Sequence, residues 1–102
     1  MFYPSDAVAT ERATELAANT RGICFIRVGR PAVPIVYDNE ETFAIGKAKI
    51  VRQSDDDKVL VVAAGITLVE ALKAADQLKE QVNTSIFDGI NLICLILICK
   101  YF

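Results

Sequence analysis

The sequence predicts an α/β fold made of incomplete three-layer α/β/α pieces with a mostly parallel sheet, joined by a linker. Two observations support this prediction. Nearly unbroken apolar runs at 23–28 and 59–64 are typical of strands that are covered on both faces. Segments with helical spacing at 5–19 and 67–81 accompany these runs, so helices and strands alternate along the chain.

The first helix is expected over 5–19. Its apolar residues recur at i, i+4, i+7 and i+8, which places them on one face; they are Ala9, Ala13, Leu16 and Ala17. Ser5 is the expected N-cap, and Gly22 follows where a left-handed residue ends a helix. A strand at 23–28 comes next. The segment 30–47 then contains prolines, an acidic patch and only short apolar pieces, which is typical of a connector.

A second block combines two strands, a helix and a further strand. A short strand is expected at 48–52 and a buried one at 59–64. The helix at 67–81 and a strand at 84–88 follow. The segment from Val59 to Asp88 therefore has the length and order of one βαβ unit.

The turn into the second helix carries two local signals. Thr67 and Glu70 have the spacing of a capping box, in which the threonine hydroxyl and the glutamate carboxylate satisfy free amides of the first turn. Gly65 precedes them at a position where a helix N-terminus favours an anion. However, the further glycines of a dinucleotide fingerprint and the Gly-Lys-Ser/Thr of a phosphate-binding loop are absent. An ordinary turn between strand and helix is the favoured interpretation.

The end of the chain differs in kind. Residues 92–99 are uninterrupted apolar residues, and as a helix they cover roughly 12 Å, well short of the ~30 Å hydrocarbon core of a bilayer. No membrane span is therefore expected. The run 92–98 combines high β-propensity with no charge and no proline, a pattern that stacks with copies of itself when exposed. A chain that ends at Asp88 is accordingly expected to be more soluble than the full chain.

Composition excludes several classes of function. Eleven Lys and Arg against thirteen Asp and Glu leave a net charge of −2 without a basic stripe, so nucleic-acid binding is not expected. The absence of histidine removes imidazole catalysis and imidazole metal ligation. Cys24, Cys94 and Cys99 have no Cys-x-x-Cys spacing, and Asp55 to Asp57 lack the spaced ligands of a calcium loop, so no metal site is predicted. Without a signal-peptide pattern, a cytoplasmic location is expected.

Arg30 is the candidate binding residue. It follows the strand 23–28 and Gly29, which places it at the carboxyl end of a sheet, where open α/β folds bind ligands. The guanidinium fork suits a phosphate or a carboxylate. From position alone, a surface-loop arginine beside Pro31 remains the favoured interpretation.

Four stretches resemble animal transketolases closely: FYPSDAVATE at 2–11, LAANTRGICFIR at 16–27, AKIV at 48–51 and GITL at 65–68. The resemblance extends to Asp88 without a large gap. It implies that residues 1–29 are the end of the pyrimidine-binding domain and 30–47 the linker. It further implies that 48–88 begin the C-terminal domain, whereas 89–102 are a divergent apolar tail.

The resemblance also implies a function. Transketolases transfer a two-carbon ketol unit between sugar phosphates in the pentose phosphate pathway, using thiamine diphosphate and Mg²⁺ in a homodimer. Arg30 stands where the family has its substrate-phosphate arginine in an Arg-Pro pair, which reverses the interpretation from position alone. Gly29 replaces the usual serine, and Val69 stands where histidine is common.

No catalytic, cofactor-binding or metal-binding residue is assigned to this chain, because the family's corresponding motifs lie outside the matching span. The chain alone is therefore predicted to be inactive and to hold no cofactor by itself. The alternative hypothesis is a non-catalytic interaction module that pairs with transketolase or with itself through exposed sheet edges. A membrane-tethered form ranks third.

Overall fold

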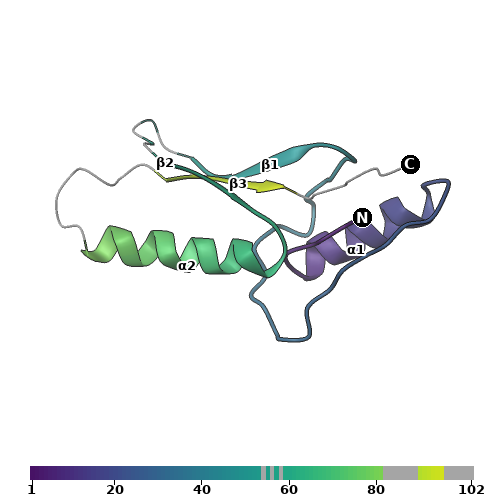
Figure 1. Cartoon of the computed structure of the whole chain (residues 1–102), viewed down its shortest axis with the longest axis horizontal. Helices are drawn as coiled ribbons and strands as arrows, with labels where there is room; N and C mark the ends of the chain where they lie inside the picture. The colour runs from purple at the N-terminus through teal and green to yellow at the C-terminus, as the bar shows by residue number, and fades with distance from the viewer. Residues whose placement is uncertain (54, 56, 58, 82–89, 96–102) are drawn as a thin grey trace.

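The computed structural model describes residues 1–53, 55, 57, 59–81 and 90–95. In the view of Figure 1, the helix α2 runs along one side of a small sheet, and α1 lies beyond the end of α2. The α/β class predicted from the sequence is thus confirmed. The described elements in chain order are α1 (Ala7–Ala18), β1 (Ala48–Arg52), β2 (Val59–Ala63), α2 (Ile66–Gln81) and β3 (Ile90–Leu95).

The sheet has the order β1-β3-β2. The β2 and β3 strands pair in parallel, as the predicted βαβ unit requires, whereas β1 pairs with β3 antiparallel. The expectation of a mostly parallel sheet therefore holds for one of the two described pairings. Ile50 and Val62 are both in register with Ile93, so these three positions form one row across the sheet.

The middle strand comes from residues that the sequence analysis expected to be an exposed tail. Instead, residues 90–95 pair on both edges, with β1 on one side and β2 on the other. An uncharged, mostly apolar run fits this position because both of its edges are hydrogen-bonded there. The second strand of the βαβ unit is therefore β3. The predicted strand at 84–88 lies outside the described residues.

Helix α1 begins one residue later than its expected cap suggests. The N-cap is Asp6 and not Ser5: its backbone is extended (φ −147°, ψ −174°), and its carboxylate accepts the Ala9 N–H at 2.8 Å. Asn19 forms the C-cap, and its N–H donates to the Glu15 carbonyl oxygen at 3.1 Å. A carboxylate reaches the free amides of the first turn and also suits the positive end of the helix dipole.

The predicted capping box of the second helix is wrong. Helix α2 already begins at Ile66, so Thr67 lies within the first turn instead of preceding it. Its hydroxyl donates to the Ala64 carbonyl oxygen at 2.8 Å and accepts the Ala64 N–H at 3.1 Å. Glu70 accepts a hydrogen bond from Lys73 at 3.0 Å. The threonine thus bonds locally to the preceding turn, a common alternative to capping.

The predicted strand at 23–28 is also wrong. In this segment a single bridge joins Ile26 to Phe2 in parallel, with hydrogen bonds from the Phe2 N–H to the Phe25 carbonyl oxygen and from the Arg27 N–H to the Phe2 carbonyl oxygen. Side-chain exposures of 103% at Ile23 and 61% at Phe25 show why. An apolar strand needs neighbouring strands that pair with its edges and other elements that cover its faces, and the described part of the chain does not supply them here.

The core joins the two halves of the chain. A cluster of buried side chains connects α1, the connector, β2 and α2; it contains Val8, Ala9, Tyr37, Ala63 and Leu68. Val51 and Val61 pack against this cluster from the sheet. Phe2 and Leu68 are the largest fully buried side chains. The N-terminal segment is therefore part of the same core as the βαβ unit.

Candidate functional site

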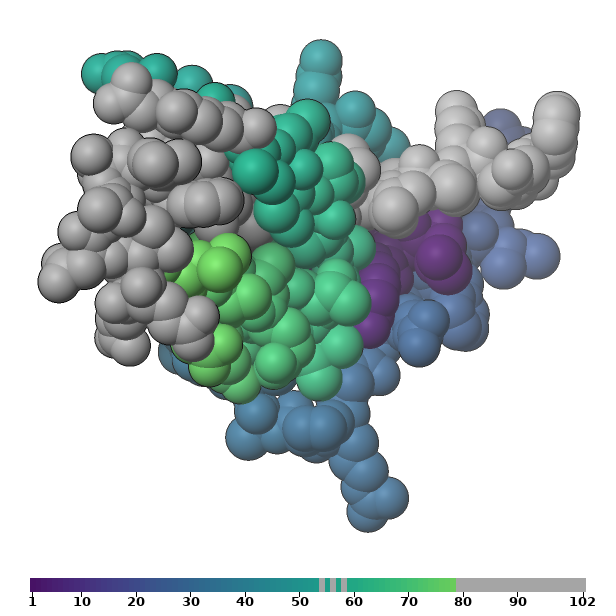
Figure 2. Space-filling view, turned by 60° about the vertical axis from the view of Figure 1, so that its left-hand side comes forward, coloured from purple at the N-terminus to yellow at the C-terminus, as the bar shows by residue number. Residues whose placement is uncertain are grey.

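The segment around Arg30 forms a projecting loop next to the start of α1. It stands out from the body in blue at the lower edge of Figures 1 and 2. Arg30 is exposed, and its guanidinium makes no hydrogen bond or ion pair with any residue that the structure describes. Its neighbours Gly29 and Pro31 line an open pocket of 510 Å³. Arg30 therefore lies at the rim of this pocket, where its five donors are available to a ligand.

The pocket is bounded by the beginning of the chain and by the loop. Tyr3, Ser5, Asp6 and Thr10 line one side, and Val28 and Val33 line the other. Backbone contacts between Phe2 and the segment 25–27 bring the two sides together. This arrangement places a mostly apolar cavity beside a cationic side chain, a combination that is typical of small-molecule sites.

Asp6 fixes the far end of the loop. Its Oδ2 accepts the Val36 N–H at 2.7 Å and the Tyr37 N–H at 2.9 Å, while Oδ1 caps α1 through Ala9. The residue is only 3% exposed. One buried carboxylate thus ties the loop to the helix start, and the sequence analysis missed it because two of its three donors lie about thirty residues away in the chain.

Tyr3 closes the pocket toward the βαβ unit. Its ring packs on Gly65, so close that a side chain at Gly65 overlaps the ring atoms, and Gly65 has φ +56°. The Arg27 guanidinium lies 4.8 Å from the Tyr3 ring centroid. Gly65 therefore serves close packing and a left-handed turn. This observation supports the interpretation of an ordinary strand-to-helix turn over a phosphate cradle.

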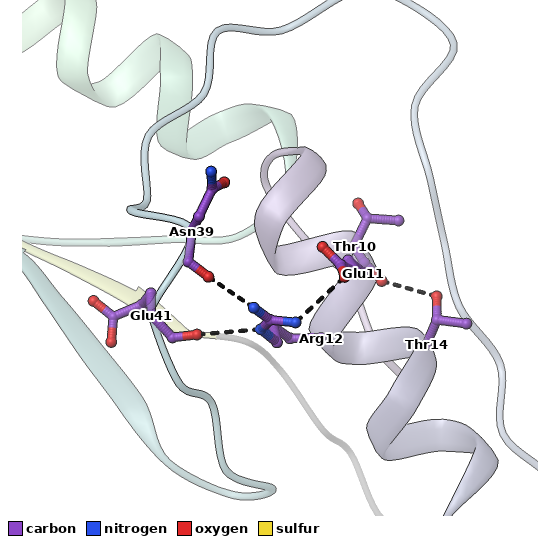
Figure 3. Close-up of polar contacts among 6 residues, drawn as sticks. All are labelled: Thr10, Glu11, Arg12, Thr14, Asn39 and Glu41. Carbon is purple, nitrogen blue, oxygen red and sulfur yellow. Dashed lines mark hydrogen bonds and ion pairs between the residues drawn. The ribbon is translucent and has the colours of Figure 1, made fainter.

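A second polar cluster fastens the connector to α1. The Arg12 side chain donates from Nη2 to the Asn39 carbonyl oxygen at 2.7 Å and from Nε to the Glu41 carbonyl oxygen at 3.4 Å. Its Nη1 forms an ion pair with Glu11 at 3.4 Å (Figure 3). Because two of these donors are directed at backbone carbonyl oxygens, the cluster has a structural role. Arg12 and Glu41 also line an open cavity of 370 Å³, but the Arg12 guanidinium is already engaged there.

Glu41 links the same connector to β1. Its carboxylate pairs with the Lys49 ammonium and accepts the Thr42 N–H at 3.1 Å. The hydrogen bond from Lys49, followed by that from Thr42, holds the pKa of the Glu41 carboxyl below its usual range. The ammonium also lies 5.2 Å from the Phe43 ring centroid. This pair stabilises the approach of the connector to the sheet.

The described residues do not fit a metal or a diphosphate cofactor. Nowhere in the described ranges do three or more His, Cys, Asp or Glu side chains gather. Mg²⁺ that holds a diphosphate needs several converging oxygen ligands, which these residues do not supply. The predicted acidic turn contributes Asp55 to a turn between β1 and β2. Cys24 is free and half-buried, Cys94 lies in β3, and Cys99 is outside the described residues.

Neither α1 nor α2, the helices of the described residues, is long and apolar enough to cross a bilayer.

Comparison with known proteins decides the family. No family model matches the chain. However, it is 58% identical to human transketolase over 89 residues, which cover 86% of this chain and 14% of the human protein. It is 61% identical to mouse transketolase over 80 residues, covering 78% of this chain and 13% of that protein. The chain belongs to the transketolase family.

Two further relatives support the same assignment. Bovine transketolase-like protein 1 is 58% identical over 81 residues, which cover 79% of the chain and 14% of that protein. A solved structure described as a split-gene transketolase, an inactive beta4 tetramer, superposes with a TM-score of 0.78 at 29% identity. That superposition covers 93% of this chain and 29% of the solved one. This segment therefore spans about one seventh of the length of the transketolases it matches.

Proposed function

We propose that this transketolase segment carries part of a sugar-phosphate-binding site in which Arg30 binds the phosphate. The observation that carries the proposal is the exposed Arg30 guanidinium, unengaged by any described residue, at the rim of the pocket. The sequence context agrees, because Arg30 and Pro31 match the family's arginine-proline pair. The loop that bears them is anchored by the buried Asp6 carboxylate.

The chemistry of this arrangement is recognition, not bond making. A guanidinium presents two parallel N–H donors to phosphate oxygens and keeps its charge at every physiological pH. The apolar pocket wall beside it, including Val28 and Val33, excludes water from part of the sugar. Together these features select a small phosphorylated molecule.

The chain alone is proposed to be inactive in ketol transfer. Thiamine diphosphate and Mg²⁺ supply the carbanion chemistry of the family, and the described residues do not fit them. The same proposal places the chain in the cytoplasm and its parent enzyme, a homodimer, in the pentose phosphate pathway. A coupled assay with ribose 5-phosphate, xylulose 5-phosphate, thiamine diphosphate and Mg²⁺ is expected to show no turnover. Turnover above the blank contradicts this part of the proposal.

Binding by Arg30 is tested on the chain itself. Titration with ribose 5-phosphate, followed by amide NMR shifts, is expected to move resonances of the loop 28–36, whereas ribose leaves them in place. Arg30→Ala is expected to weaken binding about tenfold or more, since a charged hydrogen bond contributes about 1.5–3 kcal/mol. Arg21→Ala, which removes another exposed arginine, is the matched control. Equal weakening by both variants refutes the assignment.

In a complete transketolase that carries this segment, the same change has a sharper readout. Arg30→Ala is expected to raise KM for phosphorylated substrates while sparing unphosphorylated ones. An equal loss for both substrate classes contradicts the role of Arg30 in phosphate binding.

A second candidate function is non-catalytic association, with transketolase or with a second copy of the chain. The specific observation in its favour is the exposed apolar surface of the segment 23–28 and of the sheet, which includes Ile23, Phe25, Leu60 and Val62. Retention of the chain on immobilised transketolase and light scattering of the pure chain test the two forms of association.

A further inference from the structure

The two outer strands of the sheet differ in how their edges are protected. The β2 strand, Val-Leu-Val-Val-Ala from Val59 to Ala63, contains no charge and no proline, and its pairing with β3 is continuous. It lies at the end of the described strand order. Natural sheets blunt such edges with charges, prolines or bulges, because unpaired backbone groups recruit another strand. The β2 edge has none of these devices.

The opposite edge has two of them. The β1 strand carries Lys49 and Arg52, and its register shifts between Ile50 and Arg52. Arg52 pairs with Asp76 of α2 at 2.8 Å, and Lys49 pairs with Glu41 of the connector. A bulged strand with two fixed charges is a poor template for pairing. Protection is therefore confined to the β1 side.

The β2 strand also exposes apolar side chains, most strongly on the face of Leu60 and Val62, although Val59 at the start of the other face is 43% exposed. Leu60 and Val62 are 60% and 53% exposed, whereas Ala63 is buried and Val61 packs against the core with α2. This alternation follows the two-residue period of a strand. The exposed pair is thus held on a rigid element that already carries its own core on the other face.

From this contrast we infer that a second copy of the chain pairs with β2 antiparallel, about a two-fold axis at Val61. This deepens the association named as the second candidate function. The pairing places Leu60 of each copy opposite Val62 of the other on the exposed face. It extends the sheet to the order β1-β3-β2-β2-β3-β1, with both α2 helices on the same face.

A second copy fits this edge for three reasons. Antiparallel pairing of identical strands is self-complementary, so a two-fold arrangement closes and leaves no further β2 edge. No like charges face each other, because the strand is uncharged. Apolar cross-strand pairs such as Leu60 with Val62 stabilise antiparallel ladders.

The test is the mass of the full chain in solution, measured by light scattering and by sedimentation across a concentration series. The wild-type chain is expected at twice its 11.2 kDa mass. The double variant Leu60→Lys, Val62→Lys is expected to dissociate about tenfold or more readily, since it places like charges opposite each other. Both positions are exposed, so the fold tolerates the change.

Two controls keep misfolding and other surfaces apart from this edge. Ile50→Lys lies on the same exposed face but on β1, at 57% exposure, and is expected to leave the dimer intact. A double variant Leu60→Glu, Val62→Glu is expected to be monomeric alone and to form a dimer when mixed with the lysine variant. Such rescue requires that both variants are folded and that these side chains face each other.

Each alternative outcome is decisive. A wild-type monomer overturns the inference, and so does a dimer that the lysine variant leaves unchanged. A third outcome is that Ile50→Lys dissociates the dimer and that the mixed lysine and glutamate variants do not form one. Association then occurs through the sheet face, which overturns pairing at β2 but leaves the second candidate function in place. Failure of Arg30 to bind ribose 5-phosphate has no bearing on these masses, so the phosphate proposal and this inference fail separately.

Discussion

Replacing Asp6 by alanine tests how strongly one buried carboxylate holds the site together. The side chain caps α1 through the Ala9 N–H and accepts the N–H groups of Val36 and Tyr37 at 2.7 and 2.9 Å. Asp6→Ala removes both carboxylate oxygens and with them all three hydrogen bonds. The backbone donors stay in place, at a position that is only 3% exposed.

The expected loss follows from these contacts. Removing an N-cap acceptor costs about 1 kcal/mol. A buried donor left unsatisfied costs about 1–3 kcal/mol, and two such donors face Asp6. We therefore expect a decrease of about 3–7 kcal/mol in the free energy of unfolding, a large share of the 5–15 kcal/mol that is typical of small domains. Asp6→Asn keeps one acceptor for the cap and is expected to lose less.

Urea unfolding followed by circular dichroism measures this difference. Asp38→Ala is the matched control, because it removes the same charge from an exposed position next to Tyr37, one of the residues that Asp6 binds. If Asp6→Ala unfolds within about 0.5 kcal/mol of this control, a value usual for surface substitutions, the reasoning about the buried donors is refuted.

The remaining predictions concern two other contacts and the end of the chain. A non-glycine residue in the left-handed conformation of Gly65 costs about 1–2 kcal/mol. Gly65→Ala is expected to lower the free energy of unfolding by more than this, because the new methyl group meets the Tyr3 ring. In a double-mutant cycle the cost should shrink when Tyr3 is alanine; an unchanged cost argues against the contact. Because the pKa of Glu41 is lowered in the folded chain, its carboxylate stabilises the fold above the ordinary carboxyl pKa. The wild-type chain is therefore expected to be more stable than Glu41→Gln at neutral pH, and this difference in stability is expected to disappear as the pH falls through the lowered pKa. Thermal unfolding from pH 7 to pH 3 measures it, and an advantage independent of pH contradicts the assignment. A chain that ends at Asp88 lacks the central strand β3, so it is expected to unfold at lower temperature and to be less soluble than the full chain; equal or better behaviour favours the sequence-based expectation.

Local patterns in the sequence predicted the elements that depend on local physics. The apolar run at 59–64 became β2, and the periodic segment at 67–81 became α2, each within one residue at its start. The segment 23–28 is apolar except for Arg27, yet it forms only the bridge at Ile26. The difference lies in neighbours: β2 has β3 and α2 beside it, and no local pattern reveals such long-range pairing.

The candidate site shows the same division. Arg30 was found because its position after an apolar run and before a proline is a local signal. Asp6 was missed as the anchor of the loop, since its donors at Val36 and Tyr37 lie far along the chain. The sequence analysis considered a phosphate-binding turn at Gly65 and favoured an ordinary turn, but it could not show that the ring of the distant Tyr3 leaves no room for a side chain there. Residues that act through long-range contacts require the structure.

The packing of Tyr3 on Gly65 also bears on how the chain is made. These residues are separated by about sixty positions, so the N-terminal segment cannot reach its final place until most of the chain has left the ribosome. During synthesis, α1 and the loop with Arg30 are made before the βαβ unit, which contributes Ile66 to the lining of the pocket. The order of translation thus runs against the order in which the pocket is completed, and Tyr3 lacks its contact with Gly65 until the turn into α2 has been made.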